Sequence, residues 1–303
     1  MIVAYIYYIY YVKIFVVKKP SYKSRGVSFK LKASRTIFSL LLSVALLLCG
    51  LSSGCTSDKK ATSSYAQLPV LRIGSDDYPP FFSINEDSTY IGVDVEIATE
   101  ACRRMGYKPQ FVLIPWQDKD SYLSSGKLDW LWGSFSMNGR EDRYYWAGPY
   151  LNSRQVIAVA KDAQITKLAD LEGKRVAVQS TSKPDEIFSG QSDVAVPNIK
   201  QLYTFSDIDY VIAALQNGYV DAVAGHESVL TDHMKSSNGS FRLLDDELLE
   251  VQLGVAFYKD GDRTVADRLT KTLNEMNSDG FIADVLRRHG IYNDKMLTGD
   301  RNA

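Results

Sequence analysis

Short apolar runs alternate with helix-like stretches along the chain from Leu68 to Gly290. The runs VLRIGS and RVAVQS have the length and the branched residues of buried strands, whereas VDVEIATEACRRMGY and RTVADRLTKTLNEMNSDG space their apolar residues as helices do. Strands separated by helices of this length are typical of mostly parallel sheets. The pattern therefore predicts an α/β fold.

The chain has 303 residues, 45% hydrophobic content and a net charge of −1. It is long enough for about two domains or lobes with a large buried core. Its near-neutral charge lacks the basic excess of a nucleic-acid-binding protein, so we expect no nucleic-acid partner.

Residues 28–55, SFKLKASRTIFSLLLSVALLLCGLSSGC, have the layout of a secretory signal. Three basic residues precede an apolar core from Ile37 to Leu48, and small residues continue to Cys55. That core is short for a membrane span, which needs about 20 apolar residues. The ending LSSGC resembles the lipobox of bacterial lipoproteins, although Ser52 stands where a leucine is usual. The resemblance implies lipidation of Cys55 and an extracytoplasmic, membrane-anchored protein.

The segments on either side of this signal are expected to lie outside the folded body. The polar residues 56–67, TSDKKATSSYAQ, are typical of a flexible tether. Residues 1–26 fit no signal well, and Lys13 interrupts them as a membrane segment, so we interpret them as a start-site artefact with translation beginning at Val27. At the other end, residues 293–303 form a tail.

Cys102 is the one cysteine outside the signal segment, and it lies on a predicted helix. We expect it to be buried as a small hydrophobic residue. The three histidines, His226, His233 and His289, lack the close spacing of metal ligands, and no glycine-rich phosphate loop is present. We therefore expect no metal and no cofactor.

Several longer stretches, taken together, resemble a known family. LRIGSDDYPPFF, YIGVDVEIATEACRRMGYKPQFVLIPW and LSSGKLDWLWGSFSMNGREDRYYWAGPY are similar to the first lobe of the family 3 bacterial extracellular solute-binding proteins, the amino-acid receptors of ABC importers. ITKLADLEGKRVAVQSTS and LQNGYVDAVAGHESVL resemble the second lobe, and LGVAFYKDGDRTVADRLTKTLNEMNSDGFIADVLRRHG resembles the return to the first. The similarity covers about residues 68–290.

The resemblance implies a two-lobed, type II periplasmic-binding-protein-like fold with two hinge crossovers. Lobe 1 would comprise residues 68–160 plus 254–292, and lobe 2 residues 161–253. The hinges would lie near residues 158–162 and 251–256. A ligand that contacts both lobes favours the closed arrangement by its higher affinity for that state.

The stretch DWLWGSFSMNGREDRYYWAGPY, residues 129–150, contains the candidate carboxylate-binding residue. The family places an arginine a few residues past a strand, and counting back from WAGPY puts Arg140 there. A guanidinium is planar, always charged and able to bind a carboxylate through two N–H groups. From the residues alone, a surface pairing with Glu141 or Asp142 is the alternative, and Arg143 is a rival. The neighbours expected to share the carboxylate are Gly133, Ser134 and Ser136, with Phe135 where the family has a hydroxyl.

The second lobe is expected to contribute hydroxyls and an acid. Thr181 and Ser182 precede a predicted helix, where they would either contact the same carboxylate or cap the helix, and both roles are compatible. The family's acidic partner for the ligand ammonium falls at His226, so we assign that role to the adjacent Glu227. The alternative is that His226 contacts a polar or acidic group of the ligand.

The loop DDYPPFF is expected to line the ligand site through Asp77, Tyr78 and Phe81. The two prolines favour an extended backbone that holds a ring in place. Of the tryptophans, Trp132 beside Gly133 is the candidate for the site. An aromatic pocket would then be formed by Tyr78, Phe81, Trp132 and Phe135.

These features predict a monomeric, non-enzymatic receptor that binds an amino acid or similar zwitterion and delivers it to ABC permease subunits. One alternative is an enzyme of the cyclohexadienyl dehydratase type on the same scaffold, with His226 and Glu227 as acid and base. Adjacent residues of a strand point to opposite faces, which argues against that pair. The other alternative is a ligand sensor without transport.

Overall fold

The computed structural model describes residues 67–298. The expected signal, the lipidation site Cys55 and nearly all of the tether 56–67 lie outside the described residues, as do residues 299–303 of the tail. Among residues 67–298, no helix combines the length and the apolar composition needed to cross a membrane.

Eight strands form one mixed sheet in the order β4-β1-β5-β10-β6-β9-β7-β8. Strand β1 is parallel to β4 and β5, and β7 is parallel to β8 and β9, whereas β6 and β10 run antiparallel to their neighbours. The strands are β1 (Val70–Ser75), β4 (Lys108–Leu113), β5 (Trp130–Leu131), β6 (Tyr145–Ala160), β7 (Arg175–Gln179), β8 (Gln201–Phe205), β9 (Ala222–His226) and β10 (Phe241–Phe257). A separate two-stranded hairpin pairs β2 (Ser83–Ile84) with β3 (Tyr90–Ile91).

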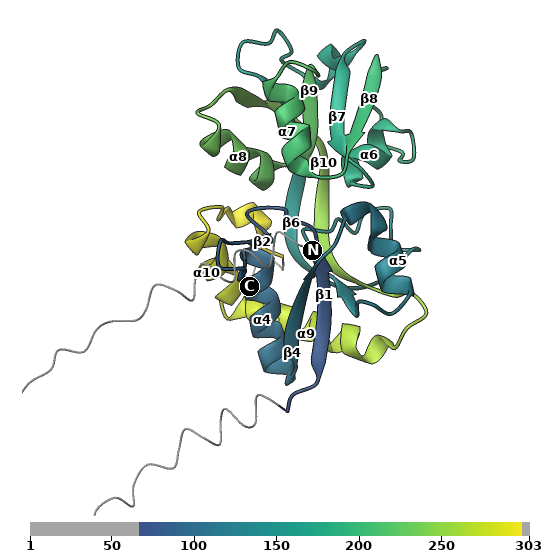
Figure 1. Ribbon diagram of the computed structural model, residues 1–303, viewed down its shortest axis with the longest axis vertical. Helices are drawn as coiled ribbons and strands as arrows, with labels where there is room; N and C mark the ends of the chain where they lie inside the picture. The colour runs from purple at the N-terminus through teal and green to yellow at the C-terminus, as the bar shows by residue number, and fades with distance from the viewer. Residues whose placement is uncertain (1–66, 299–303) are drawn as a thin grey trace, which may run out of the picture. The chain divides into compact units, whose positions relative to one another are not determined.

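Helices cover the sheet in two groups, which lie toward opposite ends of the long strands β6 and β10 (Figure 1). The first group is α4 (Val93–Met105), α5 (Lys119–Ser124), α9 (Arg263–Ser278) and α10 (Phe281–Arg288). The second is α6 (Lys183–Phe188), α7 (Ile208–Gln216) and α8 (Glu227–Ser236). The 3₁₀ turns are η1 (Trp116–Asp118), η2 (Leu168–Leu171) and η3 (Asp294–Met296). We call the group with β1–β5 lobe 1 and the group with β7–β9 lobe 2.

The long strands β6 and β10 pass from one lobe into the other (Figure 1). Residues Gln155–Val159 of β6 already pair with lobe-2 strand β9. The crossing on β6 therefore lies before Gln155, N-terminal to the expected segment 158–162. On β10, Ala256 pairs with β5 of lobe 1, so its crossing lies at or before the end of the expected segment 251–256.

Helix α4 illustrates how the sequence pattern determines an element. Its apolar positions Val93, Ile97, Ala101 and Met105 recur every four residues and are all buried. The helix ends where Gly106 adopts a left-handed conformation with φ of 73°. Cys102 on this helix is a free cysteine with no exposed surface, in line with the expected buried role.

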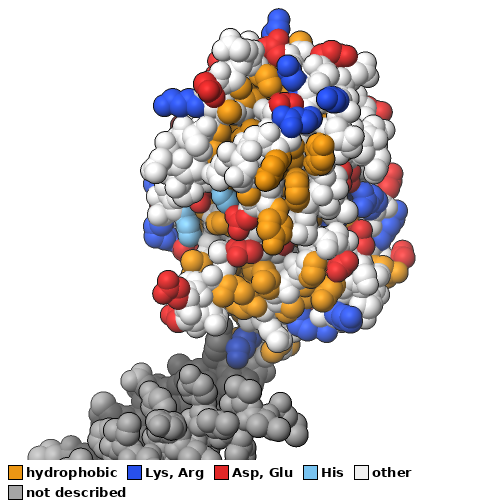
Figure 2. Space-filling model, turned by 45° about the horizontal axis from the view of Figure 1, so that its top comes forward, with side chains coloured by type: hydrophobic (Ala, Val, Ile, Leu, Met, Phe, Trp, Pro, Cys, Tyr) orange, Lys and Arg blue, Asp and Glu red, His pale blue; other side chains and the backbone are white. Residues whose placement is uncertain are grey.

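The surface charges are mixed, in agreement with the near-neutral net charge. On the face of the described residues that Figure 2 presents, acidic and basic side chains are interspersed and do not form a continuous basic surface. That face does not have the basic area typical of proteins that bind nucleic-acid backbones.

Candidate functional site

A small cavity lies between the lobes, and we call it the interlobe cavity. It is lined by the loops after β1 and β5 of lobe 1 and by the ends of β7 and β9 and the start of α6 of lobe 2. Its volume is about 30 Å³, whereas pockets for small ligands usually measure about 300–1,000 Å³. In this arrangement the cavity is too small to hold a small-molecule ligand.

Arg140 is the central charged group of the interlobe cavity. Its side chain is 2% exposed, and it lies across the lobe boundary from α6. Nε donates to Glu186 Oε1 at 2.9 Å, Nη1 to the Ser136 carbonyl at 3.1 Å and Nη2 to the Thr181 carbonyl at 3.2 Å. A guanidinium has five N–H donors, so two have no acceptor within residues 67–298. Burial lowers the pKa of Arg140, but an arginine stays charged at neutral pH.

Glu186 of lobe 2 joins Arg140 to two other cations. Its carboxylate also accepts from Lys183 Nζ at 2.5 Å and from Arg143 Nη1 at 2.8 Å. Burial opposes its ionisation, but Arg140 and Lys183 outweigh that effect and hold the pKa of Glu186 below its usual value. The surface pairing of Arg140 with Glu141 or Asp142 is thus replaced by a buried ion pair between the lobes.

Phe135 stands where the family has a hydroxyl, and its ring lies in an aromatic cluster beside Arg140. The ring packs in T-shaped contacts against Trp116 and Tyr144, with centroids 4.9 and 5.2 Å away. The Arg140 guanidinium carbon lies 4.9 Å from the centre of the Phe135 ring. Aromatic rings attract cations over their faces, so the Phe135 ring stabilises the positive charge of the Arg140 guanidinium.

The loop after β5 is held in place by lobe 1. A side chain at Gly133 would place its Cβ 2.1 Å from Ser75 Oγ, so any larger residue would force Ser75 to shift. Ser134 has φ of 49°, and its N–H donates to the buried Asp94 carboxylate at 2.7 Å. Tyr150 donates to the other Asp94 oxygen at 2.8 Å. Asp94, at the start of α4, therefore fixes the loop that presents Ser134 and Ser136.

Asp76 is the one acidic residue among the described residues that line the interlobe cavity. It is 7% exposed and accepts a hydrogen bond at 2.6 Å from Gln179 Nε2 of lobe 2. Burial raises its pKa to about 7, and the bond from Gln179 only partly offsets that effect. A cationic group bound beside Asp76 would favour its ionised form.

His226 also lines the cavity, and its ring is held by hydrogen bonds. Its Nδ1 is 2.9 Å from Ser153 Oγ, and its Nε2 is 2.9 Å from Gln155 Nε2. Burial, together with the positive charge of Arg140, lowers its pKa to about 3. The ring is therefore neutral at physiological pH and cannot supply a charge to a ligand.

Two buried polar atoms beside the cavity have no hydrogen-bond partner within residues 67–298. They are Ser134 Oγ and Gln155 Oε1, on side chains that are 3% and 1% exposed. Buried polar groups are almost always paired. Their position indicates that the cavity has unused capacity to bind a polar ligand.

The structure brings eight of the expected site residues together around the interlobe cavity. They are Tyr78, Gly133, Ser134, Phe135, Ser136, Arg140, Ser182 and His226. Ser182 also accepts from the Asp185 N–H, so it caps α6. Thr181 contacts the site indirectly, through its carbonyl to Arg140 and its hydroxyl to Lys119.

Three other expected residues of lobe 1 lie away from the cavity. Asp77 is exposed, while Phe81 and Trp132 are fully buried in the hydrophobic core. Trp132 packs against the ring of Tyr150, with centroids 5.6 Å apart. The expected aromatic pocket is thus divided, with Tyr78 and Phe135 at the cavity and the other two rings in the core.

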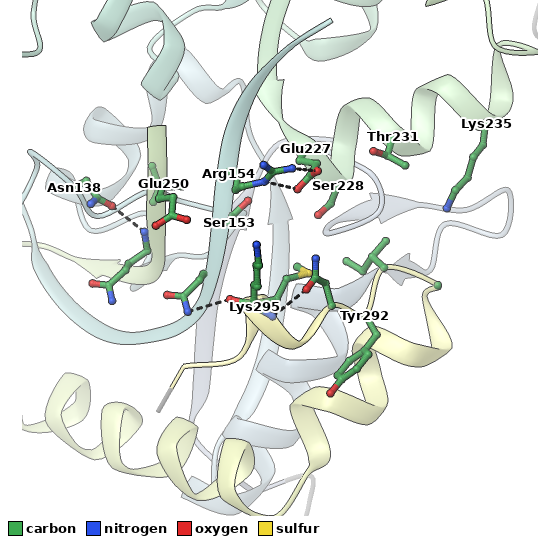
Figure 3. A pocket seen from close by; sticks show the side chains of 17 residues that line it. Asn138, Ser153, Arg154, Glu227, Ser228, Thr231, Lys235, Glu250, Tyr292 and Lys295 are labelled. Carbon is green, nitrogen blue, oxygen red and sulfur yellow. Dashed lines mark hydrogen bonds and ion pairs between the residues drawn. The ribbon is translucent and has the colours of Figure 1, made fainter. Parts of the chain in front are cut away.

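Glu227 lies in a different hollow, which we call the hinge groove. This groove has a volume of about 690 Å³ and is lined by residues 152–154 of β6, 250–252 of β10, α8 and residues 290–296. Within it, Glu227 Oε2 accepts from Arg154 Nε at 2.9 Å (Figure 3). The proposed acid–base pair of His226 and Glu227 is therefore not assembled, because the two side chains face different cavities.

The hinge groove differs from the interlobe cavity in burial. The side chains of Arg154 and Glu227 are 36% and 33% exposed, and Lys235 and Lys295 extend toward its open space (Figure 3). Exposed ion pairs contribute little free energy because water screens them. The Arg140–Glu186 pair is much more buried than the Arg154–Glu227 pair.

Sequence reasoning missed several residues of the cavity wall. Gln155 and Gln179 are polar residues in or at the end of apolar strands, which is a usable signal. Asp76, and not the expected Asp77, lines the cavity. Lys119, Lys183 and Glu186 had no local signal, because they are distant from Arg140 in the sequence, and Lys183 and Glu186 belong to the other lobe. Among residues 67–298, no His, Cys, Asp and Glu side chains converge as a metal site.

Comparisons with known proteins agree with this architecture. The L-cystine-binding protein TcyA of Bacillus subtilis is 26% identical over 267 residues, covering 85% of this chain and 96% of that protein. The histidine-binding periplasmic protein of Salmonella typhimurium is 29% identical over 246 residues, covering 76% and 91%. A solved ABC uptake transporter substrate-binding protein from Streptococcus pneumoniae with bound histidine shares the fold, with a TM-score of 0.70, 18% identity and coverage of 80% and 100%.

The family comparison covers both lobes. Residues 71–291 match a single family, and this range includes every residue that lines the interlobe cavity. The chain belongs to the bacterial extracellular solute-binding proteins, family 3.

Proposed function

We propose that this protein binds an amino acid or similar small zwitterion between its lobes and delivers it to an ABC importer. The main support for this proposal is the side chain of Arg140. It is a buried guanidinium at the lobe boundary, and two of its N–H donors have no partner within residues 67–298. A carboxylate is the group that such a pair of donors binds best. Relatives named for cystine and histidine binding support the amino-acid class.

In this proposal Asp76 takes the place of Glu227 as the partner of the ligand's ammonium. Asp76 lines the same cavity as Arg140, whereas Glu227 is paired with Arg154 in the hinge groove. A zwitterion would then bridge Arg140 at one end and Asp76 at the other. Tyr78 and the Gln179 amide would surround its ammonium end.

Ligand entry and release would follow a hinge motion about β6 and β10. The lobes are joined by Arg140–Glu186, Lys119–Thr181 and Gln179–Asp76 contacts, all of which must break on opening. A ligand that contacts both lobes stabilises the closed form by its differential affinity. A permease would recognise that form, while the lipidated Cys55 would keep the protein at the outer face of the membrane.

We propose that the ligand leaves unchanged. The neutral, hydrogen-bonded His226 is poorly suited to protonate a substrate, because its pKa is lowered to about 3. Incubation with prephenate or arogenate tests this, and we expect no product above a buffer control. Product formation that Arg140→Met abolishes would instead establish an enzyme.

A thermal-shift screen of the common amino acids and L-cystine tests the proposed function. At least one compound should raise the unfolding temperature, because a ligand that binds only the native state stabilises it. Calorimetry should then give one site per chain. A screen in which no compound stabilises the protein would contradict amino-acid binding.

Replacement of Asp76 by asparagine tests the ammonium contact through pH. The wild-type affinity for a zwitterion should fall as the pH drops below about 7, because the Asp76 carboxyl, whose pKa is raised to about 7, becomes protonated. The fall should be roughly tenfold per pH unit, the change that one proton represents. The charged and titratable groups around Asp76 are Asp77, Tyr78 and Lys119.

Calorimetric titrations at several pH values provide the measurement. Asp76→Asn should bind more weakly at neutral pH and lose the dependence between about pH 5 and 7, since burial keeps His226 neutral in that range. Parallel pH profiles for the variant and the wild type would assign the ammonium contact to another residue.

A further inference from the structure

Four cations converge beside the interlobe cavity, and we call them the cationic cluster. They are Lys119, Arg140, Arg143 and Lys183. Two carboxylates form ion pairs with the cluster: Glu186 contacts three of its members, and Asp120 lies 3.7 Å from Arg143. Asp185, the next acid along α6, accepts from the Thr181 N–H instead. Asp76, which lines the cavity and interacts with Lys119, is a third nearby acid, so the four formal positive charges exceed the negative ones by one.

Lys119 is the least compensated member of the cluster. Its side chain is 1% exposed, and its Nζ donates to the Thr181 hydroxyl at 2.8 Å. Within residues 67–298 no carboxylate forms an ion pair with it, although Asp120 and Glu186 are near enough to favour its charged form. The rings of Trp116 and Phe135 lie 5.2 and 5.9 Å from its Nζ. Buried lysines are rare unless they are paired with an acid.

The surroundings of Lys119 bring its charge next to the interlobe cavity, although Lys119 itself is not one of the lining residues. Trp116 and Phe135, which contact its ammonium, both line the interlobe cavity, as do Arg140 and Lys183. Ser134 Oγ and Gln155 Oε1 line the same cavity and have no partner among the described residues. The cavity therefore offers buried cations and unpaired polar atoms together.

The four cations of the cluster are distributed unequally between the two lobes. Lys119, Arg140 and Arg143 belong to lobe 1, where Asp120 is their acidic partner, whereas Lys183 and Glu186 belong to α6 of lobe 2. When the lobes move apart, lobe 1 would present three cations and two acids, Asp120 and Asp76, to solvent. Such a surface attracts anions and repels cations as a ligand approaches.

We propose that the ligand of this site is an acidic zwitterion with two anionic groups, such as a dicarboxylic amino acid. This rests on the function proposed above and specifies its ligand class. One carboxylate would use the two remaining N–H groups of Arg140. The second would pair with the ammonium groups of Lys119 and Lys183, and the ammonium would face Asp76. A basic amino acid would bring its second positive charge toward the cluster and be rejected.

The test compares amino acids that have the same shape but differ by one charge. Calorimetric titration of the full exported chain with L-aspartate, L-asparagine, L-glutamate and L-glutamine should show at least tenfold tighter binding of one acid than of its own amide, the effect expected for a hydrogen bond to a charged group. L-arginine should bind most weakly. An amide or L-arginine that binds as tightly as the acids would overturn the proposal while leaving amino-acid binding intact. No binding of any amino acid would instead contradict the proposed function itself.

Lys119→Met tests the residue, with Lys127→Met as the matched control. Lys127 is also a lobe-1 lysine beside an aromatic ring, but it is exposed. Lys119→Met should weaken binding of the acid at least about tenfold more than binding of its amide. Its unfolding temperature should be equal to or higher than that of the wild type, because burying an uncompensated ammonium is unfavourable.

The outcomes separate binding from structural roles. Loss of the acid preference in Lys119→Met but not in Lys127→Met supports the proposal. Equal loss of acid and amide binding with a lower unfolding temperature would show that Lys119 only supports the fold. An unchanged preference in Lys119→Met would remove that residue from the site.

Discussion

Replacing Arg140 with methionine is expected to weaken amino-acid binding by about 100-fold or more. Removing one partner of a buried, hydrogen-bonded charge pair typically costs about 2–5 kcal/mol, and the two available N–H donors of Arg140 are the proposed carboxylate contact. The fold should persist, because Glu186 keeps its contacts with Lys183 and Arg143. Calorimetry gives the affinity, and circular dichroism checks the fold.

Arg154→Met is the matched control for this experiment. Arg154 is also an ion-paired arginine near the hinge, but it faces Glu227 in the hinge groove and not the interlobe cavity. Its replacement should change ligand affinity by less than about threefold, as expected for a partly exposed pair. A larger loss in Arg154→Met than in Arg140→Met would move the ligand site to the hinge groove.

Glu186→Gln is expected to make closure of the lobes depend on ligand. The substitution leaves the buried Arg140 and Lys183 without their acid in the compact arrangement. Removing one member of a buried ion pair is destabilising by about 3–5 kcal/mol. The lobes can avoid this cost by separating, because solvent then reaches the cations. Small-angle X-ray scattering without added ligand should therefore give a larger radius of gyration than for the wild type.

Added ligand should reverse this effect in the Glu186→Gln variant. A carboxylate bound at Arg140 supplies the missing negative charge, so the compact form returns and the ligand-induced thermal shift exceeds that of the wild type. Glu227→Gln, which removes an ion-paired carboxylate outside the interlobe cavity, should behave as the wild type in scattering. A Glu186→Gln variant that stays as compact as the wild type without ligand would contradict a role for Glu186 in holding the lobes together.

Much of the fold could be predicted from the sequence because apolar periodicity reports burial. The run VLRIGS is strand β1, and the stretch ending at Gly106 is helix α4. Strand β8 could not be read in the same way, because most of its residues are exposed and the alternation is lost. The first part of β10 contains acidic residues, so its apolar pattern did not predict its long pairing with β6.

The site was only partly predictable, for a physical reason. Arg140 and the loop 133–136 lie on one continuous segment, so local pattern and family resemblance predicted them together, and they line one cavity. Lys119 lies on α5 of lobe 1, whereas Lys183 and Glu186 lie on α6 of lobe 2, so their approach to Arg140 depends on tertiary structure that the sequence pattern does not show. Glu227 was chosen over His226 for its charge, but the strand-to-helix turn after β9 directs its carboxylate toward Arg154.

A crystal structure with the tightest-binding amino acid from the screen tests the central claim most directly. We expect the ligand in an enlarged interlobe cavity, with its carboxylate oxygens within hydrogen-bond distance of Arg140 Nη1 and Nη2 and its ammonium beside Asp76. A ligand bound in the hinge groove beside Arg154, with Arg140 still contacting only protein groups, would contradict the account.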